Sequence, residues 1–418
     1  MRRLALPMLA LALPTAIAVA GDFNPLGDGS QVNNADLLRD PTTGCENCQP
    51  PPHEWDDPWF DLDWSLAFRG AYVQTTGGNY FEASVVPSMV LRHETLRGGY
   101  EFSASAELHR STIEELRLGA VRLGFEGDYR FDTSTVLSGN LNLALTRDSA
   151  NKPGTLPTVA EQSLVVSGDG EVQIERELGP LVFTGRGNAA RTVYGPTTLL
   201  DASVVDNSYQ NNWRAGGGLR LGYRVTPILT AFVDGSVEHQ WYDGISPTYL
   251  VKLDATDYEG RIGASVKWHE LLEAETSIGY GLRRFAEPAL GEASSVLYDA
   301  SLTFRPDETL EIRGAFTTSF GAPGANSAGT ARLEYAATGD VAYRVNPWLR
   351  LRASAGWRHA ELIGTTDTDS GYSAGLGADY LLNEHTTLTG DYAYSYGQAT
   401  PSPATDEHRV TLGIAFSR

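Results

Sequence analysis

The feature that most constrains this chain is an alternation of apolar and polar residues through nearly its whole length. Near the C-terminus, Val410, Leu412, Ile414 and Phe416 fall on one face of a strand, and the residues between them are small, polar or charged. The same period of two recurs back to about Trp59, without a helical stretch. A period of two indicates strands with two different faces. Strands that meet lipid on one face and a wet interior on the other show this pattern throughout a transmembrane β-barrel.

We therefore predict an all-β fold, a transmembrane antiparallel up-and-down β-barrel over residues 59–418. Eighteen strands are expected, with sixteen as the alternative, and either number leaves room for an aqueous channel unless something plugs it. Pro87 falls inside the second strand, where it is tolerated only at a bulge or an edge. The alternation slips phase near 119–121, which predicts a β-bulge. The expected strand centres lie near residues 67, 86, 104, 123, 140, 170, 186, 218, 234, 263, 279, 300, 314, 337, 354, 375, 391 and 412.

The connections between the predicted strands are of two kinds. Short turns follow an aromatic residue and often an Arg, as in Tyr223-Arg-Val-Thr-Pro, Phe304-Arg-Pro-Asp and Tyr343-Arg-Val-Asn-Pro. Because bacterial barrels keep periplasmic turns short and outer loops long, we expect these turns to be periplasmic. The longer polar connections, expected outside the cell, are about 148–160, 195–207, 244–255, 286–293, 321–329, 361–369 and 398–406.

The N-terminal part differs from the rest. Residues 1–20 have a basic start, a short apolar run and an Ala-x-Ala site, which predict a cleaved signal peptide. Residues 21–58 show neither strand nor helix periodicity and are expected to form an irregular periplasmic segment, or a plug inside the barrel. Cys45 and Cys48 in this segment are candidates for a disulfide, since two nearby cysteines in an oxidising compartment usually pair. No metal site and no cofactor are expected.

The net charge of −20 disfavours nucleic-acid binding, which needs clustered Lys and Arg. An acidic field attracts cations and repels anions. Much of the charge is expected in outer loops, either simply solvated or bridged by divalent ions to lipopolysaccharide. The expected partners are outer-membrane lipid and lipopolysaccharide and the barrel-assembly machinery.

The alternation also assigns charged side chains to the inner face. An arginine on the lipid face at mid-membrane costs about 2–4 kcal/mol, so the phase of the arginine-bearing strands is well determined. Two interpretations stay open: arginines on one wall facing carboxylates on the other across a pore, or charges that pair with their neighbours and with water. The predicted pore-lining residues are Arg214, Arg220, Glu273, Glu275, Glu311, Arg313, Arg350, Arg352, Arg358, Asp379 and Asp391.

Catalysis is disfavoured. Enzymatic barrels gather His, Ser and a carboxylate near one rim, whereas the eight histidines of this chain are scattered. The one Gly-x-Ser-x-Gly sequence, Gly371-Tyr-Ser-Ala-Gly, falls within a predicted strand and not at the strand-to-helix turn of a nucleophile elbow.

The repeated hairpins that begin at Tyr223-Arg-Val-Thr-Pro and Tyr343-Arg-Val-Asn-Pro resemble those of a family of outer-membrane β-barrel porins, the beta-barrel porin 2 type. The resemblance covers roughly residues 60–418. It implies an outer-membrane location in a Gram-negative bacterium and, because some members occur with exopolysaccharide genes, a role in passing polymer outward. It transfers no catalytic residues.

Three functions are therefore considered. The first is a passive diffusion porin, general or cation-preferring, and an inward-folded loop among 148–160 or 195–207 would favour it. The second, which the resemblance implies, is the outer-membrane component of exopolysaccharide export, with periplasmic polysaccharide-export proteins as its partners. The third is a structural or adhesive barrel without an open pore, which a lumen filled by residues 21–58 would favour.

Overall fold

The computed structural model describes residues 60–113, 115–147, 158–323, 329–400 and 403–418. Eighteen long strands form one antiparallel sheet. They are β1 (Asp61–Thr75), β2 (Gly78–Thr95), β3 (Gly98–Ser111), β4 (Arg117–Arg130), β5 (Thr135–Thr146), β7 (Val165–Leu178), β8 (Leu181–Tyr194), β11 (Asn212–Arg224), β12 (Leu229–Tyr242), β13 (Ala255–Trp268), β14 (Leu272–Phe285), β15 (Glu292–Phe304), β16 (Leu310–Gly321), β17 (Ala331–Asn346), β18 (Leu349–Ile363), β19 (Thr368–Asn383), β20 (Thr386–Ala399) and β21 (Thr405–Ser417).

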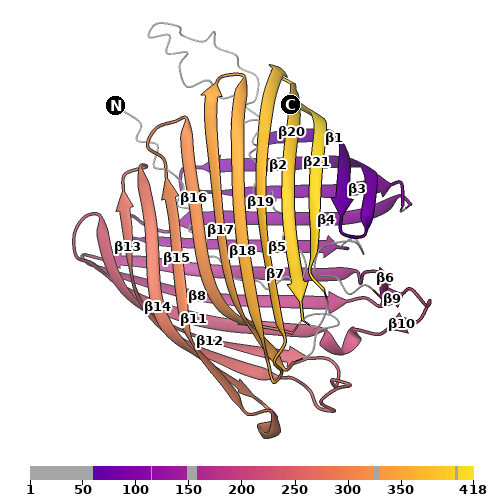
Figure 1. Ribbon diagram of the computed structural model, residues 1–418. Helices are drawn as coiled ribbons and strands as arrows, with labels where there is room; N and C mark the ends of the chain where they lie inside the picture. Colours follow the sequence, from indigo (N-terminus) through magenta and orange to yellow (C-terminus); the bar gives the residue numbers. More distant parts are fainter. Residues whose placement is uncertain (1–59, 114, 148–157, 324–328, 401–402) are drawn as a thin grey trace, which may run out of the picture.

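The sheet closes on itself. Each long strand pairs with the next one along the chain, and β1 pairs with β21 from Ser65↔Ser417 to Thr75↔Glu407. Figure 1 shows the strands of the near wall, β13 to β21, crossing those of the far wall, as tilted barrel strands do. No helix in the described part of the chain is long and apolar enough to span a membrane.

The prediction of eighteen strands is confirmed, and every expected strand centre lies inside a strand. The barrel begins at Asp61. The predicted signal peptide, the segment 21–58 and the cysteines Cys45 and Cys48 lie outside the described residues.

Both predicted irregularities are present. Gly119 is an extra residue in β4, because Glu107 of β3 pairs with Ala120 while the next residue, Leu108, pairs with Leu118. This bulge brings Leu118 and Leu123 to the same face although their numbers differ in parity. Pro87 lies in the middle of β2, and the β2–β3 ladder is interrupted there, between Val85 and Ser88. A proline cannot donate the missing backbone hydrogen bond.

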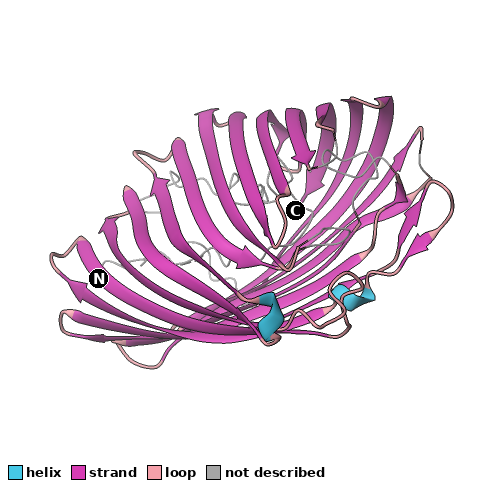
Figure 2. Ribbon diagram, turned by 60° about the horizontal axis from the view of Figure 1, so that its bottom comes forward, coloured by secondary structure: helices cyan, strands magenta, loops and turns pink. Residues whose placement is uncertain are grey.

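The two ends of the barrel differ as predicted. At one end, called the turn end below, the connections are short and the barrel's two terminal strands meet, with the Trp64 amide donating to the Arg418 carbonyl at 3.3 Å. The other end, called the loop end, carries a small sheet of β6 (Val159–Glu161), β9 (Thr197–Leu199) and β10 (Val204–Val205). It also carries the 3-10 helices η2 (Ser208–Gln210) and η3 (Pro288–Leu290), which Figure 2 shows in cyan.

Most turns at the turn end share one hydrogen-bond pattern. A side-chain oxygen accepts from the backbone N–H two residues further on, with Asp132 bonded to Ser134 at 2.7 Å, Asp307 to Thr309 at 2.8 Å and Asn346 to Trp348 at 2.9 Å. Asx and ST turns of this kind give the chain a local route to reverse direction. They account for the Asp, Asn and Thr residues that recur in the predicted turns.

One ladder is much shorter than the rest. β15 and β16 pair only from Ala300↔Phe316 to Phe304↔Ile312, although both strands continue toward the loop end. β16 keeps its pairing with β17 as far as Gly321↔Arg332. The loop-end half of β16 therefore leaves β15 while it stays joined to β17.

The face assignment predicts opposite effects for neighbouring substitutions in β5. Leu141 is half exposed on the outer face, and Asn140 lies on the inner face between Glu126 and Glu171 of the adjacent strands. We expect Leu141→Arg to lower the free energy of unfolding by about 2–4 kcal/mol, because it places a cation in lipid. Asn140→Arg should be close to neutral, since two carboxylates flank it. Urea unfolding in lipid vesicles measures both variants, and equal destabilisation would contradict the assignment.

A second prediction concerns pH. Hydrogen bonds from the side chain and backbone of Thr309 hold the pKa of Asp307 below its ordinary value of 3.8. A carboxylate with a depressed pKa stabilises the fold above its unfolded pKa and loses that contribution as the pH falls through the folded pKa. Asp307→Asn keeps an acceptor oxygen but cannot titrate. The stability difference between wild type and this variant should be larger at neutral pH than at about pH 3.

The neighbouring variant Glu308→Gln changes the same charge in the same turn and serves as the control. Urea unfolding across the pH range gives the comparison. A difference between wild type and Asp307→Asn that does not change with pH would show that the carboxylate does not stabilise this turn.

Candidate functional site: the inner wall

The eleven predicted pore-lining residues all lie in strands, at positions that alternate with outward apolar side chains. The structure brings many of them into contact with charged residues of neighbouring strands. That these residues line a pore stays a prediction.

An ion-pair network joins four strands. Asp234 of β12 is almost completely buried and accepts from Arg186 of β8 at 2.7 Å and from Arg220 of β11 at 3.2 Å. Arg220 also reaches Glu275 of β14 at 3.0 Å, and its guanidinium lies 4.0 Å from the ring centroid of Phe232. Because both arginines are held by carboxylates, little net charge is left in this sector of the wall.

Arg186 and Asp234 were not among the predicted site residues. Both alternate with outward apolar side chains in their strands, so the same alternation could have predicted that they face inward. The predicted Arg214 lies in the same sector, 3.8 Å from Glu238 of β12.

A second network lies on β18 to β20. Arg352 donates to Asp379 and to Asp391 at 2.8 Å each, and all three side chains are largely buried. Arg350 lies opposite Asp379 in the register of the β18–β19 ladder, and Arg358 lies 3.8 Å from Asp369. These predicted residues are thus brought together.

The remaining predicted residues lie toward the turn end. Glu311 accepts from Arg313 at 2.7 Å and from Arg305 at 2.6 Å, and the guanidinium of Arg313 is about half exposed (54%). Glu273 lies opposite Lys267 in the β13–β14 ladder. Local pairing, one of the two interpretations left open by the sequence, therefore holds for most of these charges.

The wall formed by β4, β5 and β7 is different. The pairing places Glu126 of β4, Asn140 of β5 and Glu171 of β7 side by side, and Glu175 lies on the same face of β7. Asp169 accepts from Asn142 at 3.1 Å. Within the described residues, Glu126, Glu171 and Glu175 form no ion pair. Sequence reasoning missed this acidic wall because it followed the arginine-bearing strands.

The acidic wall lies across the ring from β18. β7 is the sixth and β18 the fifteenth of the eighteen strands in the ring, so eight strands lie between them in either direction. β18 carries Arg350, Arg352 and Arg358. Arg352 is therefore held by carboxylates of its own wall, whereas Glu126, Glu171 and Glu175 on the opposite wall have no such ion pair among the described residues. Which of the two interpretations describes the channel stays a prediction.

A chain of polar contacts joins several strands at the loop end. Arg283 of β14 is 1% exposed and donates to the side-chain oxygen of Gln240 and, at 3.3 Å, to the Gly321 carbonyl at the end of β16. Gln240 donates to Asn212 at 3.0 Å, and Asn212 donates to the Gln210 carbonyl of η2 at 2.9 Å. These contacts tie η2, β11, β12, β14 and β16 together at the mouth.

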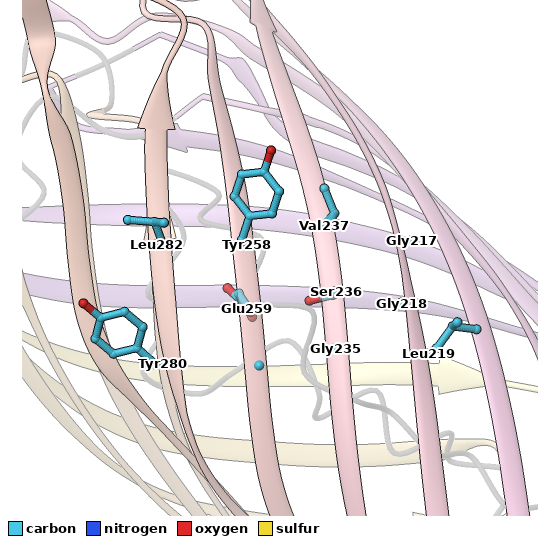
Figure 3. Close-up of a pocket in the computed structure, with 11 residues that line it drawn as sticks. Gly217, Gly218, Leu219, Gly235, Ser236, Val237, Tyr258, Glu259, Tyr280 and Leu282 are labelled. Atoms are coloured by element: carbon cyan, nitrogen blue, oxygen red, sulfur yellow. The ribbon is translucent and has the colours of Figure 1, made fainter. Parts of the chain in front are cut away.

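The wall also has a hollow of about 690 Å³ on β11 to β14. Gly217, Gly235 and Gly260 form its floor, and Figure 3 shows Tyr258 and Tyr280 beside it. These glycines occupy outward-facing positions in their strands. The hollow therefore opens on the outer face and is separate from the lumen.

A closed barrel of eighteen antiparallel strands, apolar outside and charged inside, defines a porin, a channel protein of the Gram-negative outer membrane. A family model described as "Putative beta-barrel porin 2" matches residues 84–418, and the chain belongs to that family. The resemblance seen in the sequence is thereby confirmed. Porins are channel proteins rather than enzymes. No curated protein sequence matches the chain.

Solved structures of Pseudomonas aeruginosa outer-membrane proteins are similar to the chain. OpdK in complex with vanillate is 12% identical, with a TM-score of 0.43, over 86% of this chain and 99% of that one. OccK3 (OpdO) is 13% identical, with a TM-score of 0.40, over 85% and 96%. OccK11 (OpdR) is 15% identical, with a TM-score of 0.38, over 86% and 96%.

The Arg352 network gives a stability prediction. Arg352→Met leaves Asp379 and Asp391 close together without their cation, and we expect a loss of about 2–4 kcal/mol in the free energy of unfolding. Adding Asp391→Asn should restore part of it, because the repulsion is removed. Arg313→Met is the matched control: its half-exposed ion pair should change stability by less than about 1 kcal/mol. Equal losses for the two single variants in urea unfolding would contradict this account.

Proposed function

We propose that this porin is a passive diffusion channel that prefers cations. The observation that carries the proposal is the uneven pairing of charge on the inner wall. Arg186, Arg220 and Arg352 are each held by carboxylates, whereas Glu126, Glu171 and Glu175 are not ion-paired among the described residues.

Unpaired charge acts further than paired charge. The fields of an arginine and of a carboxylate bonded to it largely cancel beyond a few ångströms, while the field of a lone carboxylate extends over about 8 Å at physiological ionic strength. A cation passing β4 to β7 therefore meets an attractive potential. The net charge of −20 acts in the same direction.

The export of exopolysaccharide and a purely structural role are the other two candidates. No described feature of the inner wall favours either of them over diffusion of small solutes.

The proposal predicts the sign of the reversal potential. In a planar bilayer with a KCl gradient, the refolded protein should open in steady steps with a cation-selective reversal potential. The double variant Glu126→Gln/Glu171→Gln should move that potential toward zero, because two unpaired charges are removed from the wall. The control Glu308→Gln/Glu384→Gln removes two charges from turns at the turn end and should leave the potential unchanged.

An anion-selective reversal potential in the wild type, or equal shifts in the two double variants, would reject the role of the acidic wall. A folded protein that never conducts would reject passive diffusion itself.

A further inference from the structure

Where the β15–β16 ladder stops, residues from the outward face of β16 and β17 contact the inner face of β15. In β16 the even-numbered residues, such as Phe316, point outward, and in β17 the odd-numbered residues, such as Val341, do so. The β16–β17 register has no break, so by the same alternation Phe320 and Leu333 should also point outward. Phe320 and Leu333 are nevertheless buried, at 8% and 7% exposure, and pack on Leu297 of β15.

Leu297 lies on the inner face. Its neighbours Val296 and Tyr298 are exposed on the outer face, at 41% and 45%. Residues of outward parity on β16 and β17 can contact an inner-face residue of β15 only if they lie on the lumen side of it. The wall therefore overlaps itself at the loop end.

A second cluster shows the same relation. Ala331, of outward parity on β17, is fully buried against Phe285 of β14 and Ala255 of β13, both on the inner face. Ile363 of β18 packs on both clusters. The loop-end parts of β16 and β17, residues 317–321 and 331–335, are called the flap below.

The flap is held by close packing and by one latch. A Cβ atom at Gly281 on the inner face of β14 would lie 3.0 Å from the Phe320 ring and 2.8 Å from Leu297, so only glycine lets the ring lie this close. The latch is the bond from Arg283 to the Gly321 carbonyl.

The flap leaves part of a strand edge without its neighbour. Residues 292–299 of β15 pair with β14 but not with β16. If the existing register continued, Val296 would face Phe320 and Tyr298 would face Thr318. In that arrangement Val296 and Phe320 would both point outward into lipid, which suits their apolar side chains. The sequence is thus compatible with a second, flush arrangement of the same strands.

We propose that the flap is a gate in the channel wall with two positions. In the overlapped position it lies on the inner face of β13 to β15 and narrows the loop end. In the flush position β16 completes its ladder with β15, and the lumen widens. Interfaces with two alternative packings are the usual basis of such switching.

The overlapped position is stabilised by burial of apolar side chains, and the flush position is stabilised by backbone pairing. The overlapped position buries Leu297 and Phe285, which would otherwise face water in the lumen. The flush position pairs the free edge of β15, which is unfavourable to leave open in a membrane. Phe320 and Leu333 are in apolar surroundings in both positions, so their transfer between the two positions favours neither one.

Three cysteine pairs test the gate, in full-length protein with Cys45→Ser and Cys48→Ser. Val296→Cys with Phe320→Cys can form a disulfide only in the flush position. Leu297→Cys with Phe320→Cys can be joined by a short, reducible bis-methanethiosulfonate only in the overlapped position. The control is Leu302→Cys with Gly314→Cys. These two residues lie directly opposite each other in the paired part of the β15–β16 ladder, and they have the same outward orientation as Val296 and Phe320 would have in the flush position.

We expect all three pairs to cross-link. The protein locked flush should show only the larger conductance level in a planar bilayer, and the protein locked overlapped should lose that level. Dithiothreitol should return both to the wild-type pattern, while the control pair should conduct like wild type throughout.

Formation of the control disulfide without that of the Val296 pair would overturn the proposal, as would identical conductance in the two locked forms. The inference rests on the protein being a channel but not on its cation preference. Cross-linking yield is read by mass spectrometry without any current, so a failure of conduction and a failure of the gate are distinguishable.

Discussion

The structure depends on one constraint: inside a bilayer, every backbone N–H and C=O must find its partner within the wall. The pairing of β1 with β21 meets it by removing the last free edge of the ring. Where the sequence breaks the ladder, as at Pro87, the break is confined to two residues. The free edge of β15 is the one larger exception among the described strands, and there the wall is two layers thick.

The same alternation that closes the barrel supplies its chemistry. Each outward apolar residue places its neighbour inside, so lumen charges accumulate in rows across adjacent strands. Whether such a row is neutral depends on which strands lie side by side. Asp234 lies opposite Arg220 in the register and also reaches Arg186, so it is neutralised, whereas the residues opposite Glu171 are Asn140 and Asn188 and it forms no ion pair with them. Selectivity is therefore a property of strand order as much as of composition.

This explains what the sequence could and could not predict. Strand positions, faces and the bulge at Gly119 follow from local periodicity, and the turns follow from residues such as Asp307 and Asn346. The partner of each charge does not, because it requires the register between strands: Arg186 and Asp234 are 48 residues apart. The family resemblance correctly indicated a porin, but it assigned no residue to the pore.

The overlap escaped prediction for a different reason. Alternation separates apolar from polar surroundings, and Phe320 is in apolar surroundings whether it faces lipid or the inner side of β15. The signal lies instead on the opposing strands. A wall that always faces water has no need of Leu297, Phe285 and Ala255 at inner positions, and all three are buried by the flap. The burial of these three side chains under the flap favours the overlapped position at rest.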